Sequence, residues 1–288
     1  MNSRNIIVIG APRSGTNMLR DILTSFKGIS TWPCDEINYI WRYGNASYPS
    51  DEIPPELATT AVKKYIRKKF LDIQKKYNSQ IVVEKTCASS LRIPFINVIF
   101  PDAKYIFIYR DGIDVTGSAK DRWTADLNLS YLLKKIQFVP IRDMPYYGLR
   151  YIWARIYRFF SKENRLAFWG PAFDNMQTIL NKFSLDEACA LQWQHCVEKA
   201  NKELSVLPHE RVCRVKYESF VRDPKNELLR ILNFVGFDTC EQQLEQAILN
   251  VSEKSIGKGH RLLEKKEVQN LQNLIGDTLS SLGYLPES

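Results

Sequence analysis

The sequence predicts an α/β fold of the P-loop-like, three-layer type, with a mostly parallel central sheet between helices. Four short runs rich in β-branched and aromatic residues are expected to be its strands, at 6–9, 80–84, 104–109 and 211–215. The first three alternate with segments of helical periodicity, which is typical of parallel strands joined by right-handed crossovers. In addition, Gly10 breaks the first run and a helical pattern begins at Asn17, as in a strand–loop–helix unit.

The first half of the chain supplies two helices after the first strand and one after each of the next two. Residues 17–23 have the apolar spacing of an amphipathic helix. Residues 57–77 form a longer and strongly basic segment after the turn at Pro54-Pro55, and its charge run is expected to be a solvated face. Shorter helices are expected at 93–100 and from Gly112 to about Trp123.

The second half is predicted to be mostly helical around a single strand. The expected helices are 186–204, 224–235, 243–250 and 268–282. Pro224 is a favourable first residue for its helix, and Gly236 is a typical stop. The basic segment 255–261 contains two glycines and is interpreted as a flexible loop. Together these elements indicate one domain over residues 1–288.

Residues 124–185 interrupt the α/β rhythm with a segment rich in aromatic residues and arginine. We interpret it as a helical insertion that forms a lid over the mouth of the site. A wall on which a sugar ring stacks is equally compatible with these residue types. A peripheral membrane contact through 144–169 is a further alternative, because a helix with Trp, Phe and Arg can lie in a membrane interface.

The composition is that of a globular protein with anionic partners. The 288 residues include 44% hydrophobic and 25% charged residues and carry a net charge of +8. This charge suits nucleotide phosphates, acidic polymers or an anionic membrane surface. No nucleic-acid-binding motif is present, so we expect no nucleic-acid partner.

The cysteines and the N-terminus favour a cytoplasmic protein, peripheral at a membrane if the insertion makes contact with one. The six cysteines are scattered without CxxC pairs or zinc-type spacing, so no metal site is expected. The first strand begins near Asn5, which leaves no room for a signal peptide, and no apolar run reaches transmembrane length. A reducing compartment is therefore the default expectation.

The loop after the first strand is the most informative motif. A strand, a Gly-bounded loop and a helix together aim backbone N–H groups and a helix N-terminus at one point, which suits phosphate or sulfate. Gly10 and Gly15 have the spacing of a Walker A loop, but the lysine of that motif is missing and Arg13 is the cation instead.

The segment Pro12-Arg13-Ser14-Gly15-Thr16 resembles the 5′-phosphosulfate loop of the sulfotransferases that use 3′-phosphoadenosine 5′-phosphosulfate (PAPS). The resemblance implies that Pro12, Arg13, Ser14, Gly15, Thr16 and Asn17 form the site for the 5′-phosphate and the sulfonate. A cation and preorganised N–H donors there would stabilise charge on the leaving oxygen without a metal.

A second segment resembles the 3′-phosphate site of that family. Arg110 ends the third strand and Ser118 follows eight residues later in the next helix. Their spacing lets both side chains reach one phosphate, with the guanidinium as a bidentate donor. The alternative for Arg110 alone is a surface salt bridge with Asp111 or Asp114.

Two later segments complete the resemblance. Tyr217, at the end of the last strand, corresponds to a tyrosine that lies near the adenine, although a tyrosine packed against the next helix is an alternative. The residues Lys258, Gly259, His260 and Arg261 are placed like the basic loop that covers the 3′-phosphate. Glycines let a backbone approach an anion and the cations complement it, but a plain solvated loop is the alternative.

The general base is expected to be a carboxylate shortly after the first helix. Several bacterial relatives and the tyrosylprotein sulfotransferases use a Glu there, and Glu36 occupies this place, with Asp35 as the next candidate. Lys85 ends the second strand, and the resemblance implies that it contacts the leaving phosphate or the sulfonate. Glu84 would then be the partner of Lys85 or a rival base.

These residues favour a PAPS-dependent sulfotransferase that acts on an acceptor hydroxyl by in-line attack. Glu36, Arg13 and Lys85 are the predicted catalytic residues, and a carbohydrate or lipid-linked glycan is the favoured acceptor, with a small alcohol as an alternative. The alternative reaction is that of a P-loop small-molecule kinase, which would need a Walker lysine and a Mg²⁺-holding Asp. A non-catalytic adaptor with the same fold is the third hypothesis.

Overall fold

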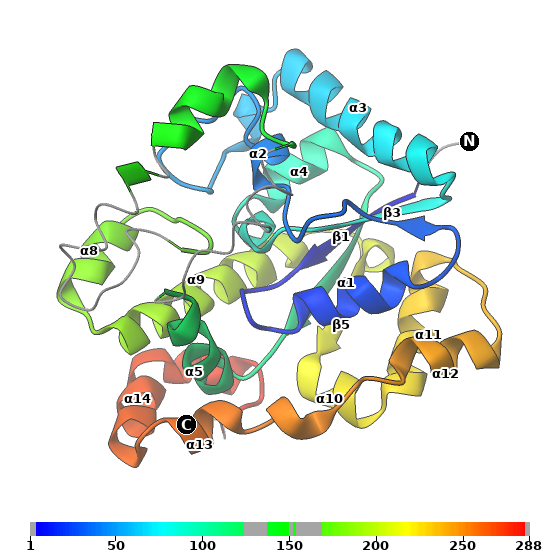
Figure 1. The fold of residues 1–288 in the computed structure, drawn as a ribbon. Helices are drawn as coiled ribbons and strands as arrows, with labels where there is room; N and C mark the ends of the chain where they lie inside the picture. The colour runs from blue at the N-terminus through cyan, green and yellow to red at the C-terminus, as the bar shows by residue number, and fades with distance from the viewer. Residues whose placement is uncertain (1–3, 124–136, 150–151, 154–168, 286–288) are drawn as a thin grey trace.

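The fold is centred on a five-stranded sheet whose neighbouring strands all pair in parallel (Figure 1). This computed structural model describes residues 4–123, 137–149, 152–153 and 169–285. The strand order is β2-β3-β1-β4-β5. The bounds are β1 Arg4–Ile9, β2 Ile29–Ser30, β3 Ile81–Lys85, β4 Lys104–Tyr109 and β5 Val212–Lys216. The predicted α/β fold class is confirmed.

The central strands are buried on both faces, which explains their continuous apolar runs. Ile6, Ile7, Val8 and Ile9 of β1 are all at most 1% exposed. The register aligns Val8 with both Lys85 of β3 and Ile106 of β4. The carboxyl ends of the three strands therefore lie at one edge of the sheet, where ligands of open parallel sheets bind.

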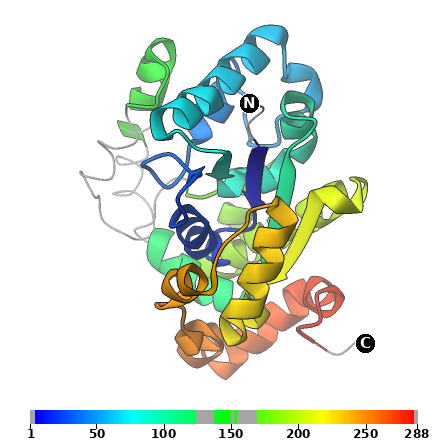
Figure 2. The same ribbon diagram turned by 90° about the vertical axis from the view of Figure 1, so that its right-hand side faces the viewer.

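One face of the sheet is covered by four helices, as the view in Figure 2 shows. They are α1 (Thr16–Thr24), α10 (Tyr217–Arg222), α11 (Pro224–Val235) and α12 (Glu241–Ile248). Ile6 and Val8 of β1 pack into this layer with Leu19 of α1. Alternate residues of a strand point to opposite faces, so Ile7 and Ile9 enter the other layer.

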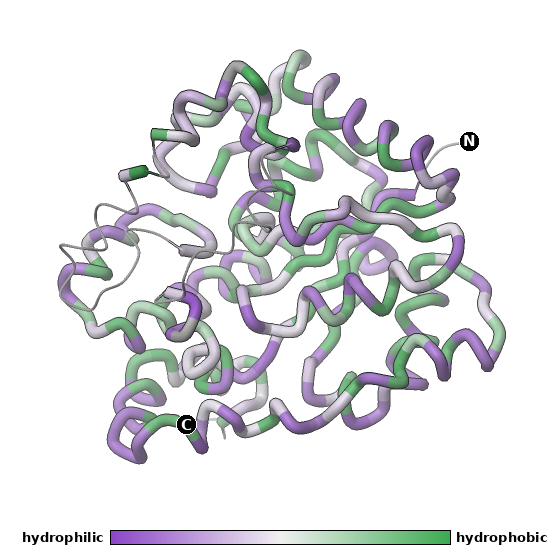
Figure 3. Tube along the Cα trace, viewed as in Figure 1, coloured by the Kyte–Doolittle hydropathy of each residue, from purple (hydrophilic) through white to green (hydrophobic). Residues whose placement is uncertain are grey.

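The opposite face carries the longer helices. They are α3 (Thr60–Tyr77), α4 (Ile93–Ile99), α9 (Leu185–Ser205) and α14 (Lys265–Ser281), with α5 (Gly112–Trp123) and α8 (Met176–Lys182) beside α9. Three fully buried aromatic side chains, Trp41, Phe70 and Trp193, fill this layer. In Figure 3 hydrophilic and hydrophobic stretches alternate along α3, as expected for a helix with one solvated face.

Helix ends follow local chemistry. The Thr59 hydroxyl accepts a hydrogen bond from Val62 N, so α3 begins after the short 3-10 helix Pro55–Leu57 rather than at residue 57. Asp223 caps α11, whose first residue is Pro224, and Gly236 ends it with φ +72°. Both ends of α11 are where the sequence predicts them.

Several short elements were not predicted, among them β2 and α2 (Asn38–Trp41). The strand β2 has two residues and the helix α2 has four, too few for either element to show a hydrophobic period. The prediction of a flexible loop at 255–261 is wrong. This segment holds the end of a 3-10 helix, Glu253–Ser255, and most of α13 (Lys258–Leu262), which packs against α5.

Part of the insertion 124–185 is described. It contains the 3-10 helix Ile141–Asp143, helical residues at 144–149 and the helix α8. Residues 124–136, 150–151 and 154–168 lie outside the described residues, so the predicted lid remains a prediction. Only part of the segment 144–169 is described, and its contact with a membrane also remains a prediction. Within the described ranges, no helix has both the length and the apolar character needed to cross a bilayer.

Candidate active site

The loop between β1 and α1 is shaped by two glycines that have no room for a side chain. A Cβ added at Gly10 would lie 2.5 Å from the carbonyl oxygen of Ile108. Gly15 has φ +88°, and a Cβ there would lie 2.5 Å from the ring of Tyr217. Arg13 also adopts a positive φ, +68°, which is uncommon for a residue with a side chain. The loop is thus held tightly against β4 and α10.

The polar groups of this loop are largely turned inward. Ser14 is completely buried, and its Oγ has no hydrogen-bond partner among the described residues. Thr16 is buried as well, with its Oγ1 3.8 Å from the Sγ of Cys87. Pro12 is buried, whereas Asn17 is exposed on the first turn of α1. An orphaned buried hydroxyl is uncommon and marks a place where another polar group can bind.

The predicted 5′ and 3′ ends of the nucleotide site are joined directly. Arg13 Nε donates a hydrogen bond of 2.9 Å to Ser118 Oγ in α5. Arg110 Nη1 lies 3.4 Å from the carbonyl oxygen of Arg13. The structure therefore brings Arg13 together with Arg110 and Ser118, which lie 97 and 105 positions later in the chain.

Arg110 is buried and faces a carboxylate. Its Nη2 lies 3.1 Å from Asp114 Oδ2 and also donates to the carbonyl oxygen of Ser255. The guanidinium carbon lies 4.5 Å from the ring centroid of Tyr217. The alternative salt bridge with Asp114 is therefore present, but it is buried rather than on the surface. The Nε of Arg110 has no hydrogen-bond partner among the described residues.

Asp114 organises the late basic segment, and the sequence analysis did not assign it this role. Its two carboxylate oxygens accept hydrogen bonds from Gly257 N and Gly259 N, each of 2.7 Å. Gly259 is buried so closely on α5 that an added Cβ would lie 2.2 Å from the Ile113 carbonyl oxygen. An Asp four residues after Arg110 was visible in the sequence, but its bonds to a segment about 145 residues later were not.

The three basic residues of α13 remain at the surface around this anchor. Lys258, His260 and Arg261 are exposed, while Gly259 is buried. His260 Nε2 lies 3.0 Å from Asp111 Oδ2, and Arg261 donates to the carbonyl oxygen of Lys254. The predicted site residues at 258–261 thus lie beside α5, the helix that carries Ser118.

Tyr217 lies inside the protein. It is 5% exposed, and its ring packs against Gly15 on one side and Arg110 on the other. This agrees with the alternative of a packed tyrosine at the start of α10. Its predicted place near an adenine remains a prediction.

Glu36 and Lys85 form an ion pair on the opposite side of the loop. Lys85 Nζ lies 3.1 Å from Glu36 Oε1, which also accepts a hydrogen bond of 3.3 Å from Cys87 N. The side chain of Lys85 is 3% exposed and that of Glu36 is 27% exposed. Burial favours the neutral form of Lys85, but the Glu36 carboxylate outweighs it, so the pKa of Lys85 lies above its ordinary value.

The prediction that Glu84 is the partner of Lys85 is wrong. Neighbouring residues of a strand point to opposite faces, so Glu84 and Lys85 cannot meet. Glu84 is completely buried and accepts a hydrogen bond of 2.6 Å from Thr86 Oγ1, and burial raises its pKa to about 7. Thr86 Oγ1 in turn accepts from Ile37 N at 3.1 Å. Glu84 therefore supports the segment that carries Glu36.

Asp35 has a different environment from Glu36. Its Oδ1 lies 3.6 Å from Arg20 Nη1, and Arg20 also donates to the carbonyl oxygen of Asp35. The side chain of Asp35 is directed at this helix residue, whereas Glu36 is directed at the strand end. Glu36 is thus the candidate base that adjoins Lys85 and the loop.

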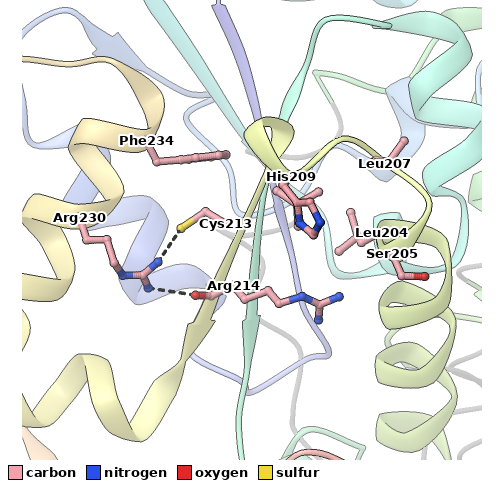
Figure 4. A pocket seen from close by; sticks show the side chains of 9 residues that line it. Leu204, Ser205, Leu207, His209, Cys213, Arg214, Arg230 and Phe234 are labelled. Carbon is pink, nitrogen blue, oxygen red and sulfur yellow. Dashed lines mark hydrogen bonds between the residues drawn. The ribbon is translucent and has the colours of Figure 1, made fainter.

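Two large surface cavities lie away from these residues. One, of about 490 Å³, lies beside the edge strand β5 and is lined by Arg214, Arg230, Cys213 and Phe234 among others (Figure 4). The second, of about 500 Å³, runs along α3. None of the predicted site residues lines either cavity. In the described part of the chain, no group of three or more His, Cys, Asp or Glu side chains is arranged to hold a metal ion.

Comparison with known proteins identifies a matching family and similar solved structures. The model of a family described as the sulfotransferase family matches residues 5–163 and 155–242. No curated protein sequence matches the chain.

Several solved structures share the fold. The sulfotransferase domain from the curacin biosynthetic pathway is similar with a TM-score of 0.55 and 13% identity, over 96% of this chain and 98% of that chain. A sulfotransferase from Alicyclobacillus acidocaldarius gives a TM-score of 0.52 and 16% identity, over 98% and 96%. Mouse sulfotransferase SULT7A1 complexed with PAP gives 0.52 and 11% identity, over 97% and 85%.

Proposed function

Because the chain belongs to the sulfotransferase family, we propose that it transfers the sulfonate group of PAPS to an acceptor hydroxyl. The observation that carries this proposal is the convergence of Arg13, Arg110 and Ser118 at the carboxyl end of the sheet. These residues belong to two segments that the sequence assigns to opposite ends of one nucleotide.

The donor site fits an anion with two charged groups. Ser14 Oγ and Arg110 Nε are buried without a hydrogen-bond partner among the described residues, and phosphate oxygens would satisfy both. The loop from Gly10 to Gly15 leads into the N-terminus of α1, a favourable place for the 5′-phosphate and the sulfonate. Arg110 and Ser118 would hold the 3′-phosphate. The solved structure of mouse SULT7A1, which shares the fold, contains PAP.

The catalytic roles follow from charge and position. When bound, PAPS supplies an activated sulfonate. Transfer forms a bond between sulfur and the acceptor oxygen and breaks the bond between sulfur and the bridging phosphate oxygen. Glu36 would accept the proton of the acceptor hydroxyl, as its carboxylate is partly exposed beside the loop. Lys85 and Arg13 would stabilise the negative charge that develops on the leaving phosphate oxygen.

For the acceptor we propose a carbohydrate or lipid-linked glycan hydroxyl. Tyr39 lies three residues after Glu36, and its ring meets that of Tyr147 from the insertion at 4.6 Å in an edge-on arrangement. Both tyrosines are half-buried, so part of each ring would be open to an acceptor. Aromatic rings of this kind suit an apolar sugar face, with the hydroxyls left for polar contacts.

The experiment is a transfer assay with the purified protein, PAPS and a panel of sugar, lipid-linked and small alcohol acceptors. We expect adenosine 3′,5′-bisphosphate to accumulate together with an acceptor whose mass has grown by one SO₃ group. The variant Arg13→Ala should lose this activity. Transfer of a phosphate from ATP, with no turnover of PAPS, would contradict the proposal.

A further inference from the structure

The outer face of α3 is a basic groove. It is lined by Thr60, Lys63, Lys64, Arg67, Lys68, Leu71, Asp72 and Lys75. Arg67 has a structural contact, since its Nε donates to the Ile99 carbonyl oxygen. Lys64, Lys68 and Lys75 are exposed, and the ion pair of Lys68 with Asp72 is itself exposed. Because exposed pairs of this kind contribute little to stability, the lysines of this face are available for a partner.

An exposed apolar strip lies in the described part of the insertion. We define it by five residues: Ile141, Met144, Leu149, Ile152 and Trp153. Their exposed fractions run from 40% for Met144 to 85% for Ile141. Inward-facing neighbours hold the same segment in place, because Asp143 is buried and the ring of Tyr147 packs on Tyr39. The strip is thus the outer side of an anchored segment.

The basic groove and the apolar strip are neighbours. Burial is the main cause that raises the pKa of the Tyr65 phenol, and the carboxylate of Asp143 contributes to the same shift. Asp143 therefore lies close to Tyr65 of α3. The ring of Tyr65 also stacks on Tyr43, which follows α2. In Figures 1 and 2 the green helix of residues 144–149 and α3 both lie at the top of the molecule.

We propose that these two features form one docking surface for an anionic lipid bilayer. The apolar strip would enter the boundary between headgroups and acyl chains, while the lysines of α3 would face the anionic headgroups. An acidic polysaccharide would use the lysines but has no need of the five exposed apolar side chains. Charge complementarity and exposed apolar area together therefore favour the bilayer. This inference goes beyond the transfer reaction and does not depend on it.

The test is co-sedimentation of the full chain with vesicles of phosphatidylcholine alone or with phosphatidylglycerol, in the presence of increasing NaCl. Binding should need phosphatidylglycerol and weaken as salt screens the lysines. The variant Lys64→Gln/Lys68→Gln/Lys75→Gln should lose roughly 100-fold in affinity, since each basic residue near an anionic surface contributes about fivefold. The matched control, Lys182→Gln/Lys265→Gln/Lys266→Gln, removes three exposed lysines elsewhere and should bind like the parent.

The apolar strip is tested separately with Leu149→Ser/Ile152→Ser, matched by Leu249→Ser on the exposed end of α12. The first variant should lose vesicle binding and the second should keep it, while both should unfold at the parent temperature. Trp153 is the most exposed of the six tryptophans, so vesicles should shift the fluorescence to shorter wavelength and Trp153→Phe should abolish the shift.

Two outcomes would overturn the proposal. Equal losses in the α3 variant and its matched control would show that only net charge matters. Binding to a soluble anionic polysaccharide such as heparin, with no binding to vesicles, would assign the lysine groove to a polymer instead. Either result leaves the transfer assay unaffected, because none of these residues belongs to the proposed catalytic or donor-binding set.

Discussion

Arg13 Nε and Ser118 Oγ lie 2.9 Å apart, although 105 residues separate them in the chain. This hydrogen bond joins the loop after β1 to the helix after β4. The two strands are neighbours in the sheet, so their carboxyl ends place loop and helix side by side. The bond also couples the positions of the two side chains that would hold the 5′ and 3′ ends of the proposed donor.

The first prediction concerns the general base. Glu36→Gln should lower kcat by about 10²- to 10⁴-fold, because the amide cannot accept the acceptor proton. Affinity for adenosine 3′,5′-bisphosphate should change by less than about twofold, as measured by calorimetry. The neighbouring variant Asp35→Asn should keep its activity, since Asp35 faces Arg20. Activity in Glu36→Gln would assign the base elsewhere.

The second prediction concerns the support beneath Glu36. Thr86→Val keeps the shape of the side chain but removes the bonds to Glu84 and to Ile37 N. Unfolding in urea should show a loss of about 1–3 kcal/mol, and kcat should fall because Glu36 is no longer fixed.

Thr116→Val is the matched control, because among the described residues the only hydrogen bond of this buried hydroxyl is to the Gly112 carbonyl oxygen of its own helix. It should keep its kcat, and Thr86→Ser should recover most of the parent value. If Thr86→Val is destabilised but retains full kcat, the threonine has only a structural role.

The third prediction is a pH dependence of stability that arises from Glu84. Burial raises its pKa to about 7 in the folded protein, above the ordinary value of 4.5. Between these two pH values the folded state therefore binds more protons than the unfolded state. The contribution of Glu84 to the free energy of unfolding should therefore be most favourable below pH 4.5. It should decline by on the order of 3 kcal/mol as the pH rises to about 7.

Comparison with Glu84→Gln isolates this contribution. The difference in the free energy of unfolding between parent and variant, measured by urea titration from pH 4.5 to 8, should change in that window and level off above it. A difference that is constant with pH would show that the carboxyl is ionised throughout.

The fourth prediction tests how α13 is seated. In Gly259→Ala the new methyl group would collide with the backbone of α5, so we expect a loss of about 1–3 kcal/mol in stability and weaker nucleotide binding. Gly276→Ala in α14 is the matched control, because nothing lies within 4 Å of its added Cβ. The control should be neutral or slightly stabilised, by up to about 1 kcal/mol, in thermal and urea unfolding. Equal behaviour of the two variants would contradict the close packing.

The sequence was sufficient for the parts of the fold that depend on local pattern. Continuous β-branched runs marked β1, β3 and β4, and Pro224 and Gly236 marked both ends of α11. It was insufficient where an element is short or is held by distant contacts. The helix α13 contains a glycine and follows another, so its local preference is for a loop, and the carboxylate of Asp114 on α5 fixes its start.

The candidate site shows the same division. The proximity of Arg13, Arg110 and Ser118 could be predicted because the carboxyl ends of parallel strands meet at one edge of a sheet. The pairing of Glu84 with Lys85, one of the two roles predicted for Glu84, is wrong, because Lys85 pairs with Glu36. The alternation of side chains along a strand already places Glu84 and Lys85 on opposite faces. Which carboxylate meets Lys85 depends on the path of residues 30–37, which no sequence period describes.

The most direct test of the account is calorimetric titration with adenosine 3′,5′-bisphosphate, adenosine 5′-monophosphate and ATP with Mg²⁺. We expect the bisphosphate to bind tightly without metal and the monophosphate to bind much more weakly. Ser118→Ala should weaken the bisphosphate by roughly 5- to 15-fold, the equivalent of one hydrogen bond, and leave the monophosphate unchanged. Absence of bisphosphate binding, or a preference for ATP with Mg²⁺, would contradict the central claim that Arg13, Arg110 and Ser118 form the site of a PAPS nucleotide.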